Sequence, residues 1–464
     1  MRRRHILGVA AGLMLGSVAT VPLMTSAVAA TTQPNIVIIV TDDQAEGTLD
    51  AMPITRAQIL DKGVLINDGI IPTSTCCPSR TALLSGQYSR TNDVYRNIGS
   101  HGGWRTFNAG GTESHTIAVA LDDAGYRTGM FGKYLNGFAL ADPGYVPPGW
   151  DQFRAIFDAD GSSSLAANAY YNYYLRGTGQ DTFYGDTPAD YSTDVLAAES
   201  ADFINDTPTD QPLFLYFATT GPHAPFIAAP RHIGTWHDET LNPAATQLTD
   251  GRPAFMPNEL LDYGGQQARL RQQHETLMSV DEAVGGIVDA LGARAENTLF
   301  VFLSDNGLQF GEHGLASKYV PYSGSTEVPM MLRWDGTITP GSTYRAAPVT
   351  NADLGATVAD AAGVSLVDPD GVSYFSPARP ESVLLEAMKN GEHPAYCGIR
   401  THRYVYVEYD SDAGEELYDY RVDPNELDNK VDDASYDKLQ ANLRAEAKRG
   451  CRPKPPGFSW ELRN

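Results

Sequence analysis

Two short apolar runs, each followed by acidic or amide residues, constrain the fold of this chain most strongly. Residues 34–44 read PNIVIIVTDDQ, and residues 297–307 read NTLFVFLSDNG. Apolar, β-branched runs without polar alternation are typical of strands that are buried on both faces, as in a parallel sheet. Residues 126–133 (YRTGMFGK) and 212–225 (PLFLYFATTGPHAP) predict two more strands of this kind.

Helical periodicity separates these runs. Apolar residues recur three or four positions apart at 116–124, at 195–203 and at 267–291. Strands that alternate with helices predict an α/β fold, in which helices sandwich a large, mostly parallel sheet. In such sheets, ligands bind beyond the carboxyl ends of the strands. All four predicted strands end in polar or charged residues, so we expect a functional site at that edge.

The N-terminal segment has the features of an export signal. Residues 1–30 contain three arginines, then an apolar stretch, and then a small-residue cleavage site at Ala27-Val28-Ala29. We therefore expect a secreted or extracytoplasmic protein without a stable membrane anchor.

The pattern changes again near the C-terminus. The segments 398–410 and 416–424 alternate like two paired antiparallel strands, and 435–448 has the periodicity of a helix. These features predict a main domain over residues 31–380, followed by a small α+β subdomain over residues 381–464.

The chain is strongly acidic. It contains 57 Asp and Glu against 34 Lys and Arg, for a net charge of −23, and removal of residues 1–30 with their three arginines would make it −26. Such a charge disfavours nucleic acids and anionic membranes as partners. It also disfavours extended binding of long polyanions. We therefore expect the ligand to be a small molecule or the terminal unit of a polymer.

The four cysteines fall into two pairs. An exported chain permits disulfides, and Cys397 and Cys451 both lie in the C-terminal part, where we expect them to pair. Cys76 and Cys77 are adjacent, and the disulfide between adjacent cysteines is strained. These two cysteines need another explanation.

Oxygen-bearing side chains gather at two strand ends. Asp42 and Asp43 follow the first apolar run, and Asp305 and Asn306 follow the run near residue 300. Hard cations such as Ca²⁺ and Mg²⁺ prefer oxygen ligands, whereas zinc and copper sites usually include His or Cys. Either pair alone could equally consist of turn or helix-cap residues. Two similar strands with similar ends favour a metal site, for Ca²⁺ first and Mg²⁺ as the alternative.

The stretch STCCPSRTALLSG, residues 74–86, predicts a helix that begins near its cysteines. Pro78 suits the first turn of a helix. A helix N-terminus stabilises anions and lowers thiol pKa values, and Arg80, one turn on, adds a positive charge. The functional interpretation is a nucleophile beside an anion site, and the alternative is a capped helix with two small buried residues.

The same stretch resembles a known family. CCPSR at residues 76–80 is similar to the C-x-P-S-R signature of type I sulfatases, which belong to the alkaline phosphatase-like superfamily. Five other stretches resemble family motifs in the family's order along the chain. They are DD at Asp42, GK at Lys133, PHAP at His223, SDNG at Asp305 and GEHGLASK at Lys318. The resemblance implies a sulfatase-like fold with the catalytic domain over residues 31–380.

The resemblance also implies a chemistry. In the family, a formylglycine-generating enzyme oxidises the first cysteine of the signature to Cα-formylglycine, so this enzyme would be a partner acting on Cys76. A hydroxyl of the aldehyde hydrate attacks sulfur while a divalent metal lowers its pKa. The metal ligands implied are Asp42, Asp43, the modified Cys76, Asp305 and Asn306. The residues implied for charge stabilisation and proton transfer are Arg80, Lys133, His223 and Lys318.

The chain departs from many sulfatases just after Lys133. Where those enzymes have a histidine two residues further on, this chain has Leu135 and then Asn136. The stretches FGKYLN, YVPPGW and YYNYYLRG resemble the N-acetylglucosamine-6-sulfatase branch, which implies a sulfated carbohydrate such as 6-sulfated N-acetylglucosamine as the substrate. Asn136 and His313 are candidate substrate-binding residues, and His313 could equally be structural.

Other functions stay open on the same residues. The fold could serve an aryl sulfatase, or a hydrolase of phosphoesters or phosphonates. A non-catalytic protein that binds anions or glycans would be expected to lack a metal ligand or the nucleophile, and none of them is missing.

Overall fold

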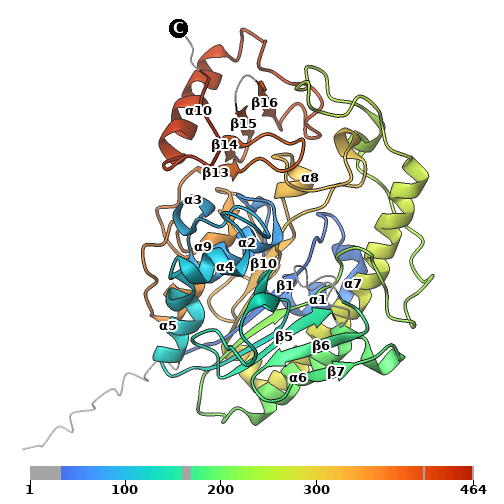
Figure 1. Ribbon diagram of the computed structural model, residues 1–464, viewed down its shortest axis with the longest axis vertical. Coiled ribbons are helices and arrows are strands. Elements are labelled where there is room, and N and C mark those ends of the chain that lie inside the picture. Colours follow the sequence, from blue (N-terminus) through green and yellow to red (C-terminus); the bar gives the residue numbers. More distant parts are fainter. Residues whose placement is uncertain (1–32, 159–168, 411–412, 462–464) are drawn as a thin grey trace, which may run out of the picture. The chain divides into compact units, whose positions relative to one another are not determined.

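A ten-stranded mixed sheet forms the centre of the computed structural model (Figure 1). The structure describes residues 33–158, 169–410 and 413–461, and the export signal expected at residues 1–30 lies outside them. The strand order is β11-β2-β10-β9-β1-β8-β4-β5-β6-β7. Several neighbouring strands, such as β1 and β9, therefore come from segments that are far apart in the sequence.

The four strands predicted from the sequence lie side by side in the middle of this sheet. They are β9 (Thr298–Ser304), β1 (Asn35–Thr41), β8 (Leu213–Ala218) and β4 (Arg127–Gly132), in that order. Each pairs with the next in parallel. Their carboxyl ends therefore share one edge of the sheet, as expected.

The sheet acquires antiparallel pairs toward both sides. The outer strands are β10 (Met330–Arg333), β2 (Val64–Ile66) and β11 (Ser342–Tyr344) on one side, and β5 (Gln152–Asp158), β6 (Tyr173–Gly177) and β7 (Thr182–Tyr184) on the other. β10 runs antiparallel to β9 and β2, and β6 runs antiparallel to β5 and β7. The predicted α/β class is confirmed, with a sheet that is parallel at its centre.

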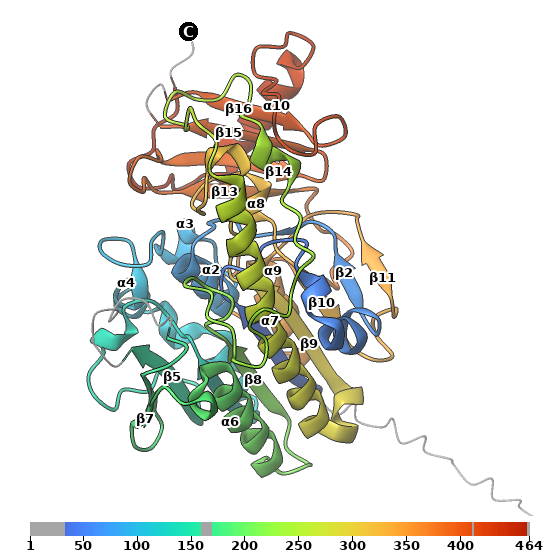
Figure 2. The same ribbon diagram turned by 90° about the vertical axis from the view of Figure 1, so that its right-hand side faces the viewer.

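Alternate side chains of β1 face two separate hydrophobic cores, because side chains alternate between the faces of a strand. Ile36 and Ile38 belong to one core, and Val37 and Ile39 belong to the other. The helices contributing to the first core are α2 (Cys76–Ser85), α5 (Ile117–Asp123) and α9 (Asn351–Ala362), and those contributing to the second are α6 (Ser192–Asp206) and α7 (Tyr263–Leu291). Figure 2 shows α6 and α7 together on one side of the strands.

Short elements complete the main domain. They are α1 (Pro53–Thr55), α3 (Ser89–Asn92), α4 (Gly103–Ala109) and α8 (Ser323–Thr326), with β3 (Gly69–Ile70) and β12 (Val349–Thr350). β3 and β12 pair in parallel as a separate two-stranded sheet. Among the helices that the structure describes, none has the length and apolar composition needed to cross a membrane.

A four-stranded antiparallel sheet with one helix forms the C-terminal part. Its strands, in order, are β13 (Ser382–Ala387), β14 (Tyr396–Thr401), β15 (Tyr404–Tyr409) and β16 (Glu415–Asp419), and its helix is α10 (Asp437–Gly450). A disulfide joins Cys397 on β14 to Cys451 just after α10, with a Cα–Cα distance of 6.5 Å. This is the pairing expected from the sequence.

One strand assignment was wrong in this part. The single strand expected over 398–410 is a hairpin of β14 and β15. The chain turns at His402 and Arg403, where the hydroxyl of Thr401 accepts a hydrogen bond from the backbone N–H of Tyr404 at 2.8 Å. The alternation of side chains continues through the turn, so periodicity alone does not reveal it.

A buried carboxyl group lies where the C-terminal segment packs on the main domain. Glu426 is 2% exposed. It accepts hydrogen bonds from the hydroxyl of Tyr420 at 2.6 Å and from the backbone N–H of Ser323 at 2.9 Å. Burial raises the pKa of the Glu426 carboxyl from 4.5 to about 7.

This carboxyl group makes stability depend on pH. The unfolded chain loses the Glu426 proton near 4.5 and the folded chain only near 7, so folding stability falls as the pH rises through that interval. The contribution lost is about 3 kcal/mol at most. We expect Glu426→Gln to flatten this decline, as measured by urea unfolding between about pH 5 and about pH 8. Glu392→Gln, at an exposed glutamate, is the matched control, and an unchanged slope in Glu426→Gln would contradict the prediction.

Candidate active site

Side chains from four adjacent strand ends meet at one edge of the central sheet. Asp42 and Asp43 follow β1, and Asp305 follows β9. The backbone pairing continues past the strands, since Asp305 N–H donates to the Thr41 carbonyl at 3.0 Å and Lys133 N–H donates to that of Ala218 at 2.8 Å. The sheet thus holds these residues in register with each other.

Helix α2 brings the cysteines to the same edge. The helix begins at Cys76, and all ten of its residues are buried. The backbone N–H of Cys77 donates to the side-chain oxygen of Asn97 at 2.9 Å, which satisfies a free donor of the first turn. The Cys76 Sγ lies 3.7 Å from Asp42 Oδ1. The helix start predicted from the sequence is confirmed.

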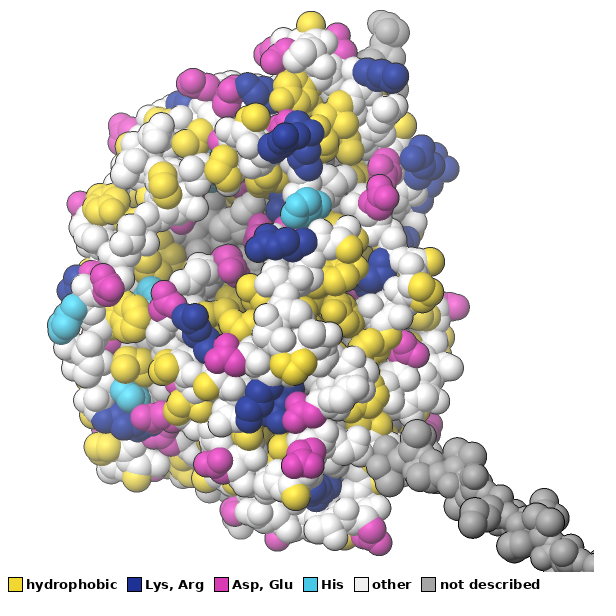
Figure 3. All heavy atoms as spheres, turned by 180° about the vertical axis from the view of Figure 1, so that it is seen from behind, with side chains coloured by type: hydrophobic (Ala, Val, Ile, Leu, Met, Phe, Trp, Pro, Cys, Tyr) yellow, Lys and Arg dark blue, Asp and Glu magenta, His cyan; other side chains and the backbone are white. Residues whose placement is uncertain are grey.

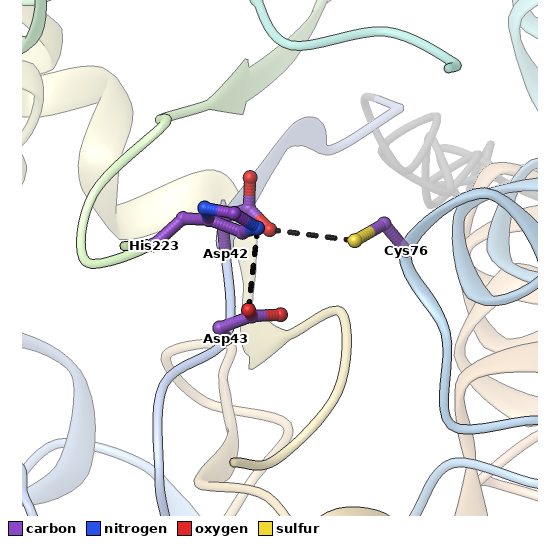
Figure 4. A group of neighbouring side chains, drawn as sticks. All are labelled: Asp42, Asp43, Cys76 and His223. Carbon is purple, nitrogen blue, oxygen red and sulfur yellow. Dashed lines mark hydrogen bonds and ion pairs between the residues drawn. The ribbon is translucent and has the colours of Figure 1, made fainter. Parts of the chain in front are cut away.

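Four side chains form a group with the spacing of metal ligands. One ligand atom from each of Asp42, Asp43, Cys76 and His223 lies within 4.8 Å of all the others. Figure 4 shows Cys76 pointing from α2 toward Asp42, and His223 directed at Asp43. The His223 Nε2 is 3.4 Å from Asp43 Oδ2.

The predicted ligands Asp305 and Asn306 touch this group. Asp305 Oδ1 accepts from the backbone N–H of Asp43 at 3.2 Å, and Asn306 Nδ2 donates to Asp43 Oδ1 at 2.7 Å. Three buried carboxyl groups and an amide oxygen within one cluster match the oxygen-rich donor set of a hard divalent cation. The residues therefore fit the metal that the sequence suggested.

Three buried cations surround the carboxyl groups. Arg80 Nε donates to Asp305 Oδ2 at 2.8 Å, and its Nη1 donates to the Lys133 carbonyl at 2.7 Å. Lys133 Nζ forms an ion pair with Asp42. Lys318 Nζ forms an ion pair with Asp43 and lies 2.8 Å from Cys76 Sγ.

These cations determine the charge state of the aspartates. Burial opposes the ionisation of Asp42, but Lys133, His223 and Arg80 outweigh it and hold its pKa below the usual value. Burial likewise opposes the ionisation of Asp43, and Lys318 and His223 hold its pKa low. Both carboxylates are therefore ionised at neutral pH and can bind a cation.

The thiol of Cys76 does not behave as its position on the helix suggested. Burial raises the pKa of the Cys76 thiol to about 11, despite the lowering effect of Lys133 and Lys318. The expected reduction by the helix N-terminus is therefore wrong for this residue. Its side chain is 1% exposed. The loss of hydration destabilises the thiolate more than the nearby positive charges stabilise it.

The two substrate-binding candidates have different surroundings. Asn136 is 4% exposed and lines a cavity beside the cluster. His313 stacks on the Tyr322 ring at 4.0 Å and its Nδ1 lies 2.7 Å from the hydroxyl of Thr249. Burial lowers the pKa of His313 to about 4. It lines neither of the two cavities described below, so its surroundings match the structural alternative.

Several residues that support the site were not predicted. Gln273 on α7 donates its Nε2 to the Asp43 carbonyl at 2.9 Å and accepts from the backbone N–H of Ala45 at 3.2 Å. Tyr319 has a φ of 75°, which is rare for a residue with a large side chain. Neither residue stands in a motif, but Tyr319 directly follows Lys318, which could have drawn attention to it.

Two cavities lie near the ends of the strands. The smaller, of about 370 Å³, opens beside the cluster, and its lining includes Ser74, Thr75, Asn136 and Tyr319. These are near neighbours in sequence of Cys76, Lys133 and Lys318. Of the two cavities, the smaller is the one lined by a predicted site residue, Asn136, and by Thr75, the chain neighbour of Cys76.

The larger cavity, of about 590 Å³, is lined by none of the predicted site residues. Its wall carries basic residues of the C-terminal segment, among them Arg400 and His402, and acidic residues of the main domain, among them Glu46 and Glu327. Figure 3 shows a hollow on the back of the molecule, with basic side chains and a histidine beside it.

The sequence matches a known family over most of its length. Residues 34–364 match the family model described as Sulfatase. The chain belongs to the sulfatase family. The resemblance stated from its motifs is thereby confirmed, and members of this family hydrolyse sulfate esters.

Individual sulfatases are similar to this chain. Human N-acetylglucosamine-6-sulfatase is 32% identical over 389 residues, which cover 77% of this chain and 66% of the human protein. The chain thus spans just under two thirds of that relative's length. The N-acetylglucosamine-6-O-sulfatase of Bacteroides thetaiotaomicron is 25% identical over 503 residues, covering 89% of this chain and 85% of that sulfatase.

A solved structure supports the fold. It is that of a protein in complex with its substrate D-glucosamine-2-N,6-O-disulfate, and it matches with a TM-score of 0.77 over 90% of this chain and 98% of its own. The sequence identity is 22%. The sulfatase-like fold expected from the sequence is confirmed.

Proposed function

We propose that this sulfatase is an exported hydrolase of 6-sulfated N-acetylglucosamine or closely related sulfated sugars. The observation that carries the proposal is the position of Cys76 at the start of α2, with its sulfur 3.7 Å from Asp42 and 2.8 Å from Lys318 Nζ. The names of the human and Bacteroides relatives support the sugar. The signal expected in residues 1–30 supports export.

Two groups would complete the site. Cα-formylglycine formed from Cys76 would supply an aldehyde hydrate. One of its hydroxyls would displace the sugar oxygen from sulfur, and loss of the proton from the other would release sulfate as the aldehyde re-forms. A Ca²⁺ ion, or Mg²⁺ in its place, would be held by Asp42, Asp43, Asp305 and Asn306 and would supply positive charge for the sulfuryl oxygens.

The side chains of the cluster then have separate tasks. The ammonium groups of Lys133 and Lys318 pair with Asp42 and Asp43, and that of Lys318 also contacts Cys76. They are placed to stabilise negative charge on the sulfuryl oxygens. Arg80 is anchored by Asp305 and the Lys133 carbonyl, so it keeps the start of α2 in position and adds a fixed charge.

His223 is placed for proton transfer to the leaving oxygen. Its Nδ1 lies 2.6 Å from the Ala224 carbonyl, which favours a proton on that nitrogen. The Nε2 is thereby directed into the cluster, toward Asp43. With Leu135 in place of a histidine near Lys133, the proton donors proposed here are Lys318 and the imidazolium form of His223, which carries a proton on Nε2 as well as on Nδ1.

A mass measurement combined with an assay tests the proposal. The tryptic peptide Gly63–Arg80, from protein made together with a formylglycine-generating enzyme, is expected to carry an aldehyde at Cys76 and an unchanged thiol at Cys77. That protein is expected to release sulfate from N-acetylglucosamine-6-sulfate much faster than phosphate from the 6-phosphate. Two intact thiols would remove the proposed nucleophile, and faster phosphate release would favour the phosphoester hydrolase.

A further inference from the structure

The cavity beside Cys76 has walls from both parts of the chain. Its volume is about 370 Å³, which is in the range of small-molecule sites. One wall comes from Ser74 and Thr75 and from the loop Tyr95–Ile98. Another comes from Ala387 at the end of β13 and from Met388 and Asn390 just after it. A leaving group bonded to a sulfate at Cys76 would occupy this space.

The charge of the lining contrasts with that of the whole chain. Acidic residues outnumber basic residues by 57 to 34 in the sequence, yet none of the described residues that line this cavity is Asp or Glu. Arg96 is the one charged residue among those described lining residues. A wall with a guanidinium and without carboxylates favours a negatively charged ligand.

Two buried polar atoms in this wall have no hydrogen-bond partner among the described residues. They are Oδ1 of Asn136 and Nε of Arg96. Asn136 is 4% exposed. A buried polar atom without a partner is costly, so a small shift of either side chain toward a ligand in the cavity would recover a hydrogen bond.

The position of Arg96 is set by neighbouring backbone groups. Its Nη2 donates to the carbonyl of Lys389, on the wall from the C-terminal segment. Its own carbonyl accepts from the backbone N–H of Gly103 at 2.9 Å, and its N–H donates to the His101 carbonyl at 3.1 Å. The guanidinium is therefore anchored at the wall, which lowers the entropy lost when it binds a ligand.

Tyr319 connects this wall to the reactive cluster. It lines the cavity and directly follows Lys318, whose ammonium group contacts Cys76. Its φ of 75° is costly for an aromatic residue, and such conformations gather at functional sites. Tyr319 thus borders both the cavity that Arg96 lines and the ammonium group of Lys318 in the cluster.

We propose that Arg96 forms a subsite for a second anionic group on the substrate, in addition to the sulfate that is cleaved. The inference rests on the proposed function and makes it more specific. The preferred substrate is a 6-sulfated glucosamine that carries another negative substituent, such as an N-sulfate. Asn136 Oδ1 accepts a hydrogen bond from a hydroxyl or N–H group of the same sugar.

Two sugars that differ in one charge test the proposal. The matured wild-type protein is compared with Arg96→Gln and Arg96→Lys on glucosamine-2-N,6-O-disulfate and on N-acetylglucosamine-6-sulfate. We expect Arg96→Gln to reduce the preference for the disulfate, as a ratio of kcat/KM values, by roughly 10- to 100-fold, mainly through KM. Arg96→Lys keeps the charge and should restore part of the preference.

An exposed arginine provides the matched control. Arg105 on α4 lines neither cavity, so Arg105→Gln should keep the wild-type ratio. The same ratio in Arg96→Gln and wild type would overturn the subsite while leaving the proposed function standing.

A binding measurement tests the Arg96 subsite separately from the proposed function. In chains that also carry Cys76→Ala, calorimetry should show roughly 10- to 100-fold weaker binding of the disulfate when Arg96 is Gln. Release of sulfate from neither sugar by the matured wild type would refute the proposed substrate. Even then, equal disulfate affinity with and without Arg96 would overturn the subsite, and a loss of affinity would support it.

Discussion

Replacing Cys76 with alanine is expected to abolish sulfate release, with a fall in kcat of at least ~10⁴-fold. The reason is that alanine cannot be converted to formylglycine, so the proposed nucleophile is never formed. The rest of the cluster remains, because Arg80 and Asp305 bond each other independently of the cysteine. The measurement is sulfate release from N-acetylglucosamine-6-sulfate, together with the melting temperature of each protein.

Cys77 offers a matched control for this variant. It is the next residue of α2, it is 0% exposed, and it belongs to the hydrophobic core under the helix. Cys77→Ala should lower the melting temperature slightly, because it leaves a small cavity, and should keep kcat within about threefold. Equal loss of activity in Cys76→Ala and Cys77→Ala would show that the first variant acts through folding.

Replacing Asp43 with asparagine is expected to remove the metal and most of the activity. Asp43 contacts Lys318, His223 and Asn306, and it would be a direct ligand of the cation. At a Ca²⁺ concentration of about 100 times the dissociation constant, the wild-type protein should gain about 2.7 kcal/mol of unfolding free energy. We expect Asp43→Asn to show little of this gain and to lose at least ~10²-fold in kcat.

A second buried aspartate distinguishes metal binding from general stability. Asp281 is 3% exposed and accepts from the backbone N–H groups of Ile54 at 2.9 Å and Thr55 at 2.6 Å, away from the cluster. Asp281→Asn should lower the melting temperature and still gain stability with Ca²⁺. A full Ca²⁺-dependent gain in Asp43→Asn would contradict the proposed metal site.

Local patterns in the sequence predicted much of the fold. The four apolar runs without alternation correspond to β1, β4, β8 and β9, and the predicted helices correspond to α5, α6, α7 and α10. Burial on both faces imposes such runs on a parallel strand. The hairpin turn at His402 was missed because alternation is the same on both sides of a turn.

The site followed from the strand ends for the same reason. Parallel strands bring their carboxyl ends to one edge, so Asp42, Lys133, His223 and Asp305 were expected near each other, and the structure places them so. The pKa of Cys76 could not be predicted in this way. It depends on how completely the surrounding segments exclude water, which no short stretch of sequence shows.

Local sequence patterns were enough to predict the class of fold, the edge of the sheet that carries the cluster, and the identity of its charged residues. They did not predict which cavity lies beside Cys76, or that Arg96, Asn136 and Tyr319 line it. The physical reason is a difference in range. The burial of a helix or strand follows from the spacing of apolar residues that are close in sequence. The wall of a cavity is formed by loops, whose positions depend on contacts between residues hundreds of positions apart.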